Sequence, residues 1–207
     1  MKFIFILFLT TTFISTNIFS ADADSENCSN KNVPSEERSF SNNFAGVFNG
    51  KRLEYTASLN EKILYEKDNP SEPMASFFYT EYIVDSEVDR PVIFSFNGGP
   101  GSASLWLHMG VLGPKVIKVP SDASDDGSAP YKIIDNKLSP LSDADLVFID
   151  PIGTGYSRAI GCHEPEEFWG VSEDPKIIAE FIRRWINDNK RWNSPRYILG
   201  ESYGGIR

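Results

Sequence analysis

Two glycine-rich segments, each directly after a short apolar run, constrain the fold of this chain more than any other feature. Residues 92–96 lead into N-G-G-P-G at residues 97–101, and residues 196–199 lead into G-E-S-Y-G at residues 200–204. Short apolar runs that end in glycine loops are typical of buried strands in α/β sheets, whose ligand sites lie at the carboxyl ends of the strands. The two segments therefore predict one site at the carboxyl edge of a sheet.

A strand and a helix are predicted before the second glycine segment. Residues 145–150 predict a central strand, and residues 175–192 predict an amphipathic helix that begins with a capping oxygen from Asp174 and a first-turn proline, Pro175. The apolar face of this helix carries Ile178, Phe181, Ile182, Trp185 and Ile186. With the strand at residues 196–199 they form a βαβ unit, which has a right-handed crossover. The predicted fold class is α/β, a mostly parallel sheet with helices on both faces.

The first part of the folded region predicts further strands. Leu53, Tyr55 and Ala57 alternate with polar residues, and the run at residues 62–65 follows a turn that contains Asn60, which predicts a hairpin within residues 50–66. Residues 76–84 and 91–96 predict strands, as do residues 115–119, and residues 121–130 predict a surface loop rich in Ser, Asp and Gly.

The first 23 residues predict a secretory signal peptide, because Met1 and Lys2 precede a long apolar stretch. Cleavage after Ser20 and cleavage after Ala23 both stay open. Threonines and serines dilute the apolar stretch, so an uncleaved membrane anchor is the less favoured interpretation. Residues 24–49 predict an exposed N-terminal arm and residues 50–207 a folded domain. The protein is expected to be secreted or periplasmic.

Charge and cysteine content exclude several classes of partner. A formal net charge of −9 and a pI near 4.8 disfavour binding to nucleic acid or to anionic membranes, so no membrane contact is expected after signal cleavage. The two cysteines, Cys28 and Cys162, and the two histidines are too widely spaced for a structural metal site, and we expect no metal and no cofactor. Whether the cysteines form a disulfide stays open.

Residues 200–204 match the G-x-S-x-G pattern of a nucleophile elbow, which makes Ser202 the candidate nucleophile. The elbow holds the serine in a strained backbone conformation, and flanking glycines let strand and helix approach closely. The alternative is a glycine-rich turn with an incidental serine. The loop at residues 97–101 lies where such hydrolases place an oxyanion-hole N–H, although it is also compatible with a purely structural turn.

Three ordered motifs resemble those of the serine carboxypeptidase family: residues 97–102 (NGGPGS), 150–157 (DPIGTGYS) and 200–205 (GESYGG). The resemblance covers residues 77–207. It implies an α/β-hydrolase fold and removal of C-terminal residues from peptides, usually best at acidic pH. It also implies a peptide partner with a free C-terminal carboxylate.

The same resemblance assigns roles to five residues. Ser202 would attack the peptide carbonyl and form an acyl-enzyme, and the N–H groups of Gly99 and Tyr203 would form the oxyanion hole. Asn97 and Glu201 would bind the terminal carboxylate. A glutamate attracts another carboxylate only while the two share a proton, which rationalises the acidic preference. Alternatively, Glu201 is the variable position of the elbow and Asn97 is a turn residue.

The sequence departs from the family pattern at three positions, where Ser95 replaces a common Trp, Ser102 a common Cys and Val111 a carboxylate-binding Glu. These changes weaken the expected recognition of a terminal carboxylate. An acyltransferase or esterase of the same family is therefore the alternative function.

Family members place the Asp and His of their catalytic triad after the nucleophile, so neither His108 nor His163 is expected to be the base. The chain is accordingly expected to be an N-terminal portion whose fold is incomplete and whose C-terminal half is missing. Expressed alone, it is expected to be inactive and poorly folded, and a non-catalytic truncated fragment is a further alternative.

Overall fold

The computed structural model describes residue 28 and residues 31–86, 88–119 and 129–207. The predicted signal peptide and residues 121–128 of the predicted surface loop lie outside the described residues. None of the described helices is long and apolar enough to cross a membrane.

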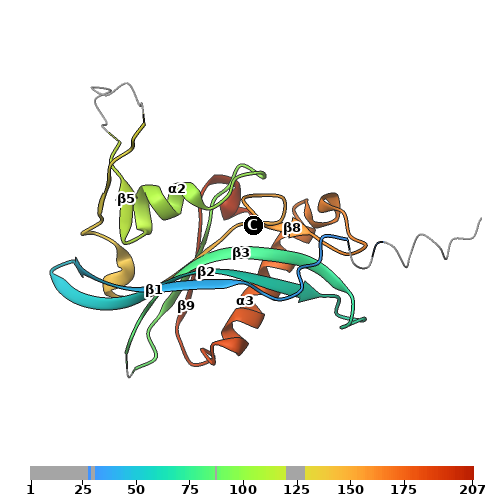
Figure 1. Cartoon of the computed structure of the whole chain (residues 1–207), viewed down its shortest axis with the longest axis horizontal. Helices are drawn as coiled ribbons and strands as arrows, with labels where there is room; N and C mark the ends of the chain where they lie inside the picture. The colour runs from blue at the N-terminus through green and yellow to red at the C-terminus, as the bar shows by residue number, and fades with distance from the viewer. Residues whose placement is uncertain (1–27, 29–30, 87, 120–128) are drawn as a thin grey trace, which may run out of the picture.

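A mixed sheet forms the centre of the molecule (Figure 1). Its strands, in spatial order, are β1 (Ser39–Phe48), β2 (Lys51–Tyr65), β3 (Pro73–Val84), β7 (Asp145–Ile149), β4 (Val92–Phe96) and β9 (Arg196–Gly200), and β8 (Arg158–Ala159) pairs with β3. Strands β7, β4 and β9 are parallel, whereas β1, β2, β3 and β7 pair antiparallel. In the described residues the predicted parallel pairing is confined to β7, β4 and β9, because short turns join β1, β2 and β3, and short turns permit only antiparallel pairing.

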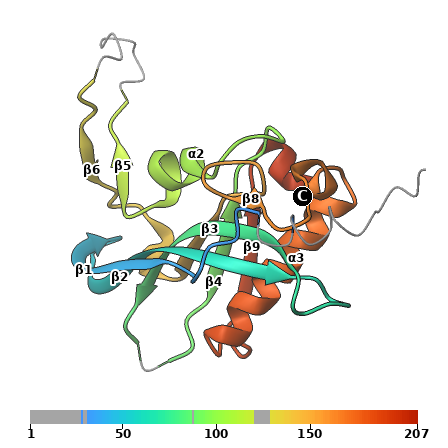
Figure 2. The same ribbon diagram turned by 45° about the vertical axis from the view of Figure 1, so that its right-hand side comes forward.

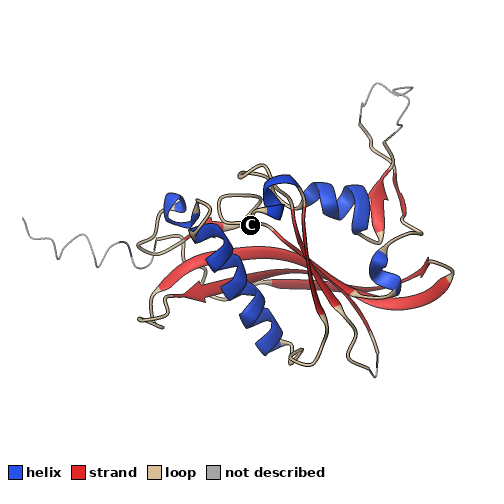
Figure 3. Cartoon of the chain, turned by 180° about the vertical axis from the view of Figure 1, so that it is seen from behind, coloured by secondary structure: helices blue, strands red, loops and turns tan. Residues whose placement is uncertain are grey.

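Helices lie on both sides of the sheet, as predicted. The long helix α3 (Glu173–Asp188) crosses one face (Figure 3), and α2 (Leu105–Leu107), η1 (His108–Leu112) and η2 (Pro140–Ser142) lie towards the other (Figure 2). Short 3-10 turns, η3 (Pro165–Phe168) and η4 (Ser202–Gly205), lie before α3 and after β9. The predicted strand at residues 115–119 is present as β5 (Lys115–Ile117), which pairs with β6 (Ile133–Asp135) apart from the main sheet.

Each face of the sheet buries an aromatic cluster, since successive side chains of a strand point to opposite faces. On the face that α3 covers, the cluster includes Phe77, Phe94, Phe181 and Trp185, which pack between the strands and the helix. On the opposite face, towards α2, the cluster includes Phe48, Tyr55, Tyr82, Phe148 and Leu107. The apolar face predicted for the helix is confirmed, with Ile182 partly buried at its border.

The chain turns at Asn49 and Gly50, so the predicted hairpin around Asn60 is wrong. Both turn residues have positive φ, 48° and 78°, as the two-residue type I′ turn requires. Strand β2 instead runs straight through Asn60, whose amide donates to Glu81 on the neighbouring strand. The predicted N-terminal arm, residues 24–49, accordingly ends in β1, and the boundary drawn at residue 50 falls within the hairpin.

A disulfide joins Cys28 to Cys162 across 134 positions of the sequence, which settles the pairing that the sequence left open. It ties the N-terminal segment to the loop between β8 and η3. Cross-links that close long loops stabilise a fold by restricting its unfolded chain.

Because Phe181 is packed in the core, truncation of its side chain should lower the free energy of unfolding strongly. Its fully buried ring packs against Phe77 and Tyr79, with ring centroids 5.1 and 5.0 Å away. Phe181→Ala should lower the free energy of unfolding by about 3–5 kcal/mol, because it leaves a cavity between helix and sheet. Denaturant titration measures the change. Val88→Ala, at an exposed position, is the control and should shift stability by less than about 0.5 kcal/mol.

Candidate active site

Ser202 lies on the sharp turn that links β9 to η4, and its side chain is exposed. Its φ of +57° is in the left-handed region, which a residue with a Cβ rarely adopts, whereas Glu201 before it is extended. Such strain marks positions where the surrounding structure holds a residue for a reason other than local preference. The hydroxyl thus stands at the carboxyl edge of the parallel strands.

The glycine loop after β4 touches this turn. A Cβ on Gly98 would collide with the carbonyl oxygen of Glu201 and lie 2.5 Å from the amide nitrogen of Tyr203. A Cβ on Gly204 would lie 2.7 Å from the carbonyl oxygen of Phe96. Glycine at these two positions is therefore what allows main chain to contact main chain.

The two predicted oxyanion-hole donors lie on the two segments that meet here. Tyr203 is the second residue of η4, so its N–H has no partner within the helix. Gly99 has φ +29°, and its carbonyl accepts a 2.7 Å hydrogen bond from the Ser102 N–H, which closes the loop into a tight turn. The loop therefore brings its backbone against the elbow without side chains in between.

Asn97 and Glu201, the predicted carboxylate-binding pair, are in contact. Asn97 Nδ2 and the Gly98 N–H donate to the same Glu201 oxygen, Oε2, at 3.3 and 3.4 Å. Asn97 is buried, and its Oδ1 accepts from the N–H of Leu107 at 3.0 Å. Glu201 is exposed on its other side. The arrangement presents one amide-anchored carboxyl group to solvent beside Ser202.

Residues 150–157, the middle motif, are held in place by hydrogen bonds to neighbouring segments. The Asp150 carboxylate accepts from the N–H of Ser104 at 2.8 Å, immediately before α2, and burial raises the pKa of Asp150. Ser157 Oγ accepts from the N–H of Phe78 at 2.8 Å. Both contacts fix the loop after β7 against neighbouring segments.

The three departures from the family pattern lie in different surroundings. Ser95 is buried within β4, Ser102 closes the glycine loop, and Val111 is exposed in η1. No glutamate replaces the one expected at position 111, so Glu201 is the acidic group that the described residues place at Asn97.

Sequence reasoning missed Arg207. Its side chain is 1% exposed, and its Nε lies 2.8 Å from both carboxylate oxygens of Asp174. One terminal nitrogen donates to the carbonyl of Asn97 at 2.7 Å, and the guanidinium lies 5.3 Å from the ring centroid of Tyr203. Arg207 thus joins α3, the glycine loop and the elbow. No pattern in the sequence indicated this role, because a single arginine five positions after the elbow serine belongs to no helical or strand periodicity.

The partnership with Arg207 also corrects the predicted start of α3. The helix begins at Glu173, one residue before the predicted capping position, and the side chain of its N-cap residue, Ser172, makes no capping hydrogen bond. Asp174 lies inside the first turn, and its carboxylate turns to Arg207 because a buried cation outweighs a local backbone N–H.

Both histidines contact groups other than Ser202. His108 Nε2 is 2.5 Å from the hydroxyl of Tyr82, and its ring stacks on Phe148 with centroids 4.7 Å apart. His163 lies between two carboxylates, Glu66 at 3.2 Å and Glu167 at 2.9 Å. That neither histidine acts as base stays a prediction from the order of the motifs in the sequence.

A positive-φ serine between a parallel strand and a short helix, beside a glycine loop from the neighbouring strand, is the arrangement of the nucleophile elbow in hydrolases. A sequence model of the serine carboxypeptidase family matches residues 59–207, so this chain belongs to that family. Membership implies an α/β-hydrolase fold, of which the mixed sheet and its helices form a part.

Similar proteins include serine carboxypeptidase-like 10 of Arabidopsis thaliana, which is 26% identical over 137 residues. That match covers 65% of this chain and 30% of the relative. Pheromone-processing carboxypeptidase KEX1 of Saccharomyces cerevisiae is 37% identical over 147 residues, which cover 68% of this chain and 19% of that protein. The chain thus spans less than a third of the length of these relatives.

Because the Arg207–Asp174 ion pair is buried, removal of one partner should lower stability strongly, and removal of both should lower it less than the sum of the two single changes. Arg207→Ala should lower the free energy of unfolding by about 3–5 kcal/mol, because it leaves the Asp174 carboxylate buried without its cation. Denaturant titration of the single variants and of a double variant with Asp174→Leu measures the coupling. The exposed pair Arg183–Glu180 is the control, and Arg183→Ala should cost less than about 1 kcal/mol.

Burial of His108 predicts an acid-sensitive contribution to stability. Burial lowers the pKa of His108 to about 4, so the unfolded chain binds a proton more readily than the folded chain. The stabilising effect is complete above pH 6.5 and is lost as pH falls towards 4, where the loss reaches about 3 kcal/mol. Urea titrations of wild type and His108→Gln at pH 7 and pH 4 measure it. An equal acid sensitivity in both proteins would contradict the prediction.

Proposed function

We propose that the whole protein is a serine-type carboxypeptidase, in which Ser202 attacks the last peptide carbonyl and forms an acyl-enzyme that water hydrolyses. The observation that carries this proposal is the contact of Asn97 and Gly98 with Glu201, immediately before the strained serine. An elbow alone fits many acyl-transfer reactions. An anchored carboxyl group beside it fits recognition of a second carboxyl group.

In this proposal, the N–H groups of Gly99 and Tyr203 stabilise the oxyanion of the tetrahedral intermediate. Close contact between the glycine loop and the elbow supports this role, since both donors must converge on one oxygen. The proton of Ser202 passes to a histidine other than His108 and His163, whose ring nitrogens face Tyr82 and two glutamates. That histidine then protonates the leaving amine.

Glu201 gives the proposed reaction its acidic preference. The substrate is a peptide with a free C-terminal carboxylate, and two carboxyl groups attract each other only while they share a proton. Asn97 donates to Glu201 and holds it in place, so the shared proton lies between Glu201 and the substrate. Two ionised carboxylates at this position would repel each other, which weakens binding.

We also propose that the protein acts outside the cytosol, as a secreted or periplasmic enzyme. The disulfide between Cys28 and Cys162 supports this, because such bonds persist in oxidising compartments. The signal-like sequence of residues 1–23 supports it independently.

The test uses the whole protein and two matched sets of N-blocked peptides, one with a free C-terminal carboxylate and one with an amide. Free peptides should be cleaved at least about tenfold faster at pH 5, and Ser202→Ala should lose at least about a thousandfold in kcat. Glu201→Gln should raise the upper pH limit of kcat/KM for free peptides and leave amides unchanged, because it removes the repulsion. Equal turnover of the two sets would reject the carboxypeptidase proposal in favour of an esterase or acyltransferase.

A further inference from the structure

Strand β1 is an edge strand without the usual protection against pairing. Among the described residues it pairs only with β2, and its register with β2 runs from Ser39 to Phe48 without a bulge. Its sequence, SFSNNFAGVF, contains no charged residue and no proline. Natural edge strands usually carry charges, prolines or bulges, because a long neutral edge invites another strand.

The backbone groups on the open side of β1 can be identified from the turn. In a hairpin with a two-residue loop, the flanking residues Phe48 and Lys51 exchange both hydrogen bonds, and every second pair does the same. The 2.8 Å bond from the N–H of Glu61 to the carbonyl of Arg38 continues this alternation. The N–H and C=O groups of the odd-numbered residues, Ser39 to Val47, therefore point away from β2.

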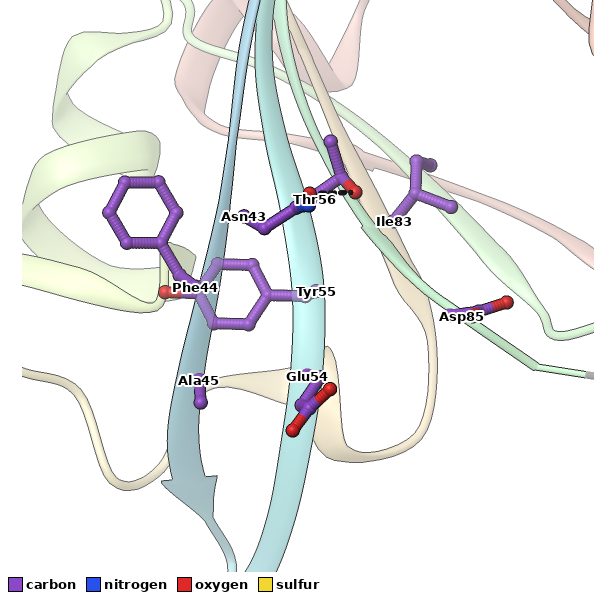
Figure 4. Close-up of a pocket in the computed structure, with 8 residues that line it drawn as sticks. All are labelled: Asn43, Phe44, Ala45, Glu54, Tyr55, Thr56, Ile83 and Asp85. Carbon is purple, nitrogen blue, oxygen red and sulfur yellow. Dashed lines mark hydrogen bonds between the residues drawn. The ribbon is translucent and has the colours of Figure 1, made fainter.

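Apolar side chains are exposed along the same edge. Phe40 is 66% and Phe44 46% exposed. Figure 4 shows Phe44 beside Tyr55, whose ring it stacks on with centroids 5.8 Å apart. A hollow of about 550 Å³ lies on the opposite face of the same edge, where Asn43, Ala45, Glu54 and Thr56 line it.

We propose that β1 pairs antiparallel with β1 of a second copy of this chain, around a two-fold axis at Phe44. In this register Ser41 bonds with Val47 of the second copy and Asn43 with Ala45, all through the outward-facing backbone groups. Phe44 meets Phe44 of the second copy in a non-hydrogen-bonded pair, the type in which side chains approach most closely. Cross-strand aromatic pairs of this kind stabilise sheets.

Charge complementarity favours a second copy over an unrelated strand. The exposed Glu36 precedes β1 and the exposed Arg52 follows its turn, whereas the neighbouring Glu37, Arg38 and Lys51 already form ion pairs with Lys62, Glu61 and Asp143. An antiparallel two-fold pair with its axis at Phe44 brings Glu36 of each copy towards Arg52 of the other. The neutral strand between them avoids the repulsion expected between two chains of net charge −9.

The test begins with sedimentation of the full chain over a range of concentrations. Wild type should show a concentration-dependent dimer. A double variant, Asn43→Lys with Ala45→Lys, should weaken the dimer at least about tenfold, because both exposed positions lie at the pairing edge. A control with lysines at Ser71 and Asn187, which are exposed elsewhere, should dimerise like wild type. A monomer at all concentrations, or equal weakening in the control, would overturn the proposal.

Cysteine cross-linking tests the register independently of stability. Phe44→Cys should form an intermolecular disulfide under mild oxidation, because the axis places the two Cα atoms about 4.5 Å apart. Phe40→Cys is the matched control, since Phe40 faces Phe48 of the second copy and not itself. Cross-linking of Phe40→Cys as fast as Phe44→Cys would reject the proposed axis.

Discussion

The contact between the glycine loop after β4 and the elbow after β9 is the constraint on which the rest of the candidate site depends. Strands β4 and β9 are adjacent and parallel, so their carboxyl ends bring the two loops together. Gly98 and Gly204 let the main chains touch. Every proposed role at the site, from the oxyanion hole to the anchoring of Glu201 by Asn97, requires the glycine loop and the elbow to stay in contact.

Buried arginine–carboxylate clusters hold both ends of the parallel strands. At the carboxyl edge, Arg207 joins Asp174 to the backbone of the glycine loop. At the amino edge, Asp145 at the start of β7 lies 3.0 Å from Arg90 and 2.9 Å from Arg191. A buried carboxylate is costly unless it is paired, so each cluster penalises any shift of the segments that supply its members. The aromatic clusters on the two faces of the sheet then fill the space between these clusters.

The sequence predicted those features that depend on residues close together in the chain. The central strands, the apolar face of α3 and the strained turn at Ser202 follow from alternation, helical periodicity and the glycine spacing around the serine. The hairpin turn was misplaced because Asn60 was interpreted as a turn residue between two strand-like runs, and the Asn49–Gly50 turn signal was assigned to the end of an exposed arm. The share of antiparallel strands was underestimated for a related reason. Strand β1 has no clear strand pattern in the sequence, and only its pairing with β2 identifies it as a strand.

The sequence by itself determined the family, the candidate nucleophile and the pairing of a glycine loop with an elbow, because these depend on residue types at short spacing. Only the tertiary structure decided which distant groups meet. The order of the strands placed β4 between β7 and β9, the disulfide joined residues 134 positions apart, and Arg207 reached Asp174 across 33 positions. Such contacts form because burial forces polar groups to find partners wherever the packed chain offers them, and no local pattern records that choice.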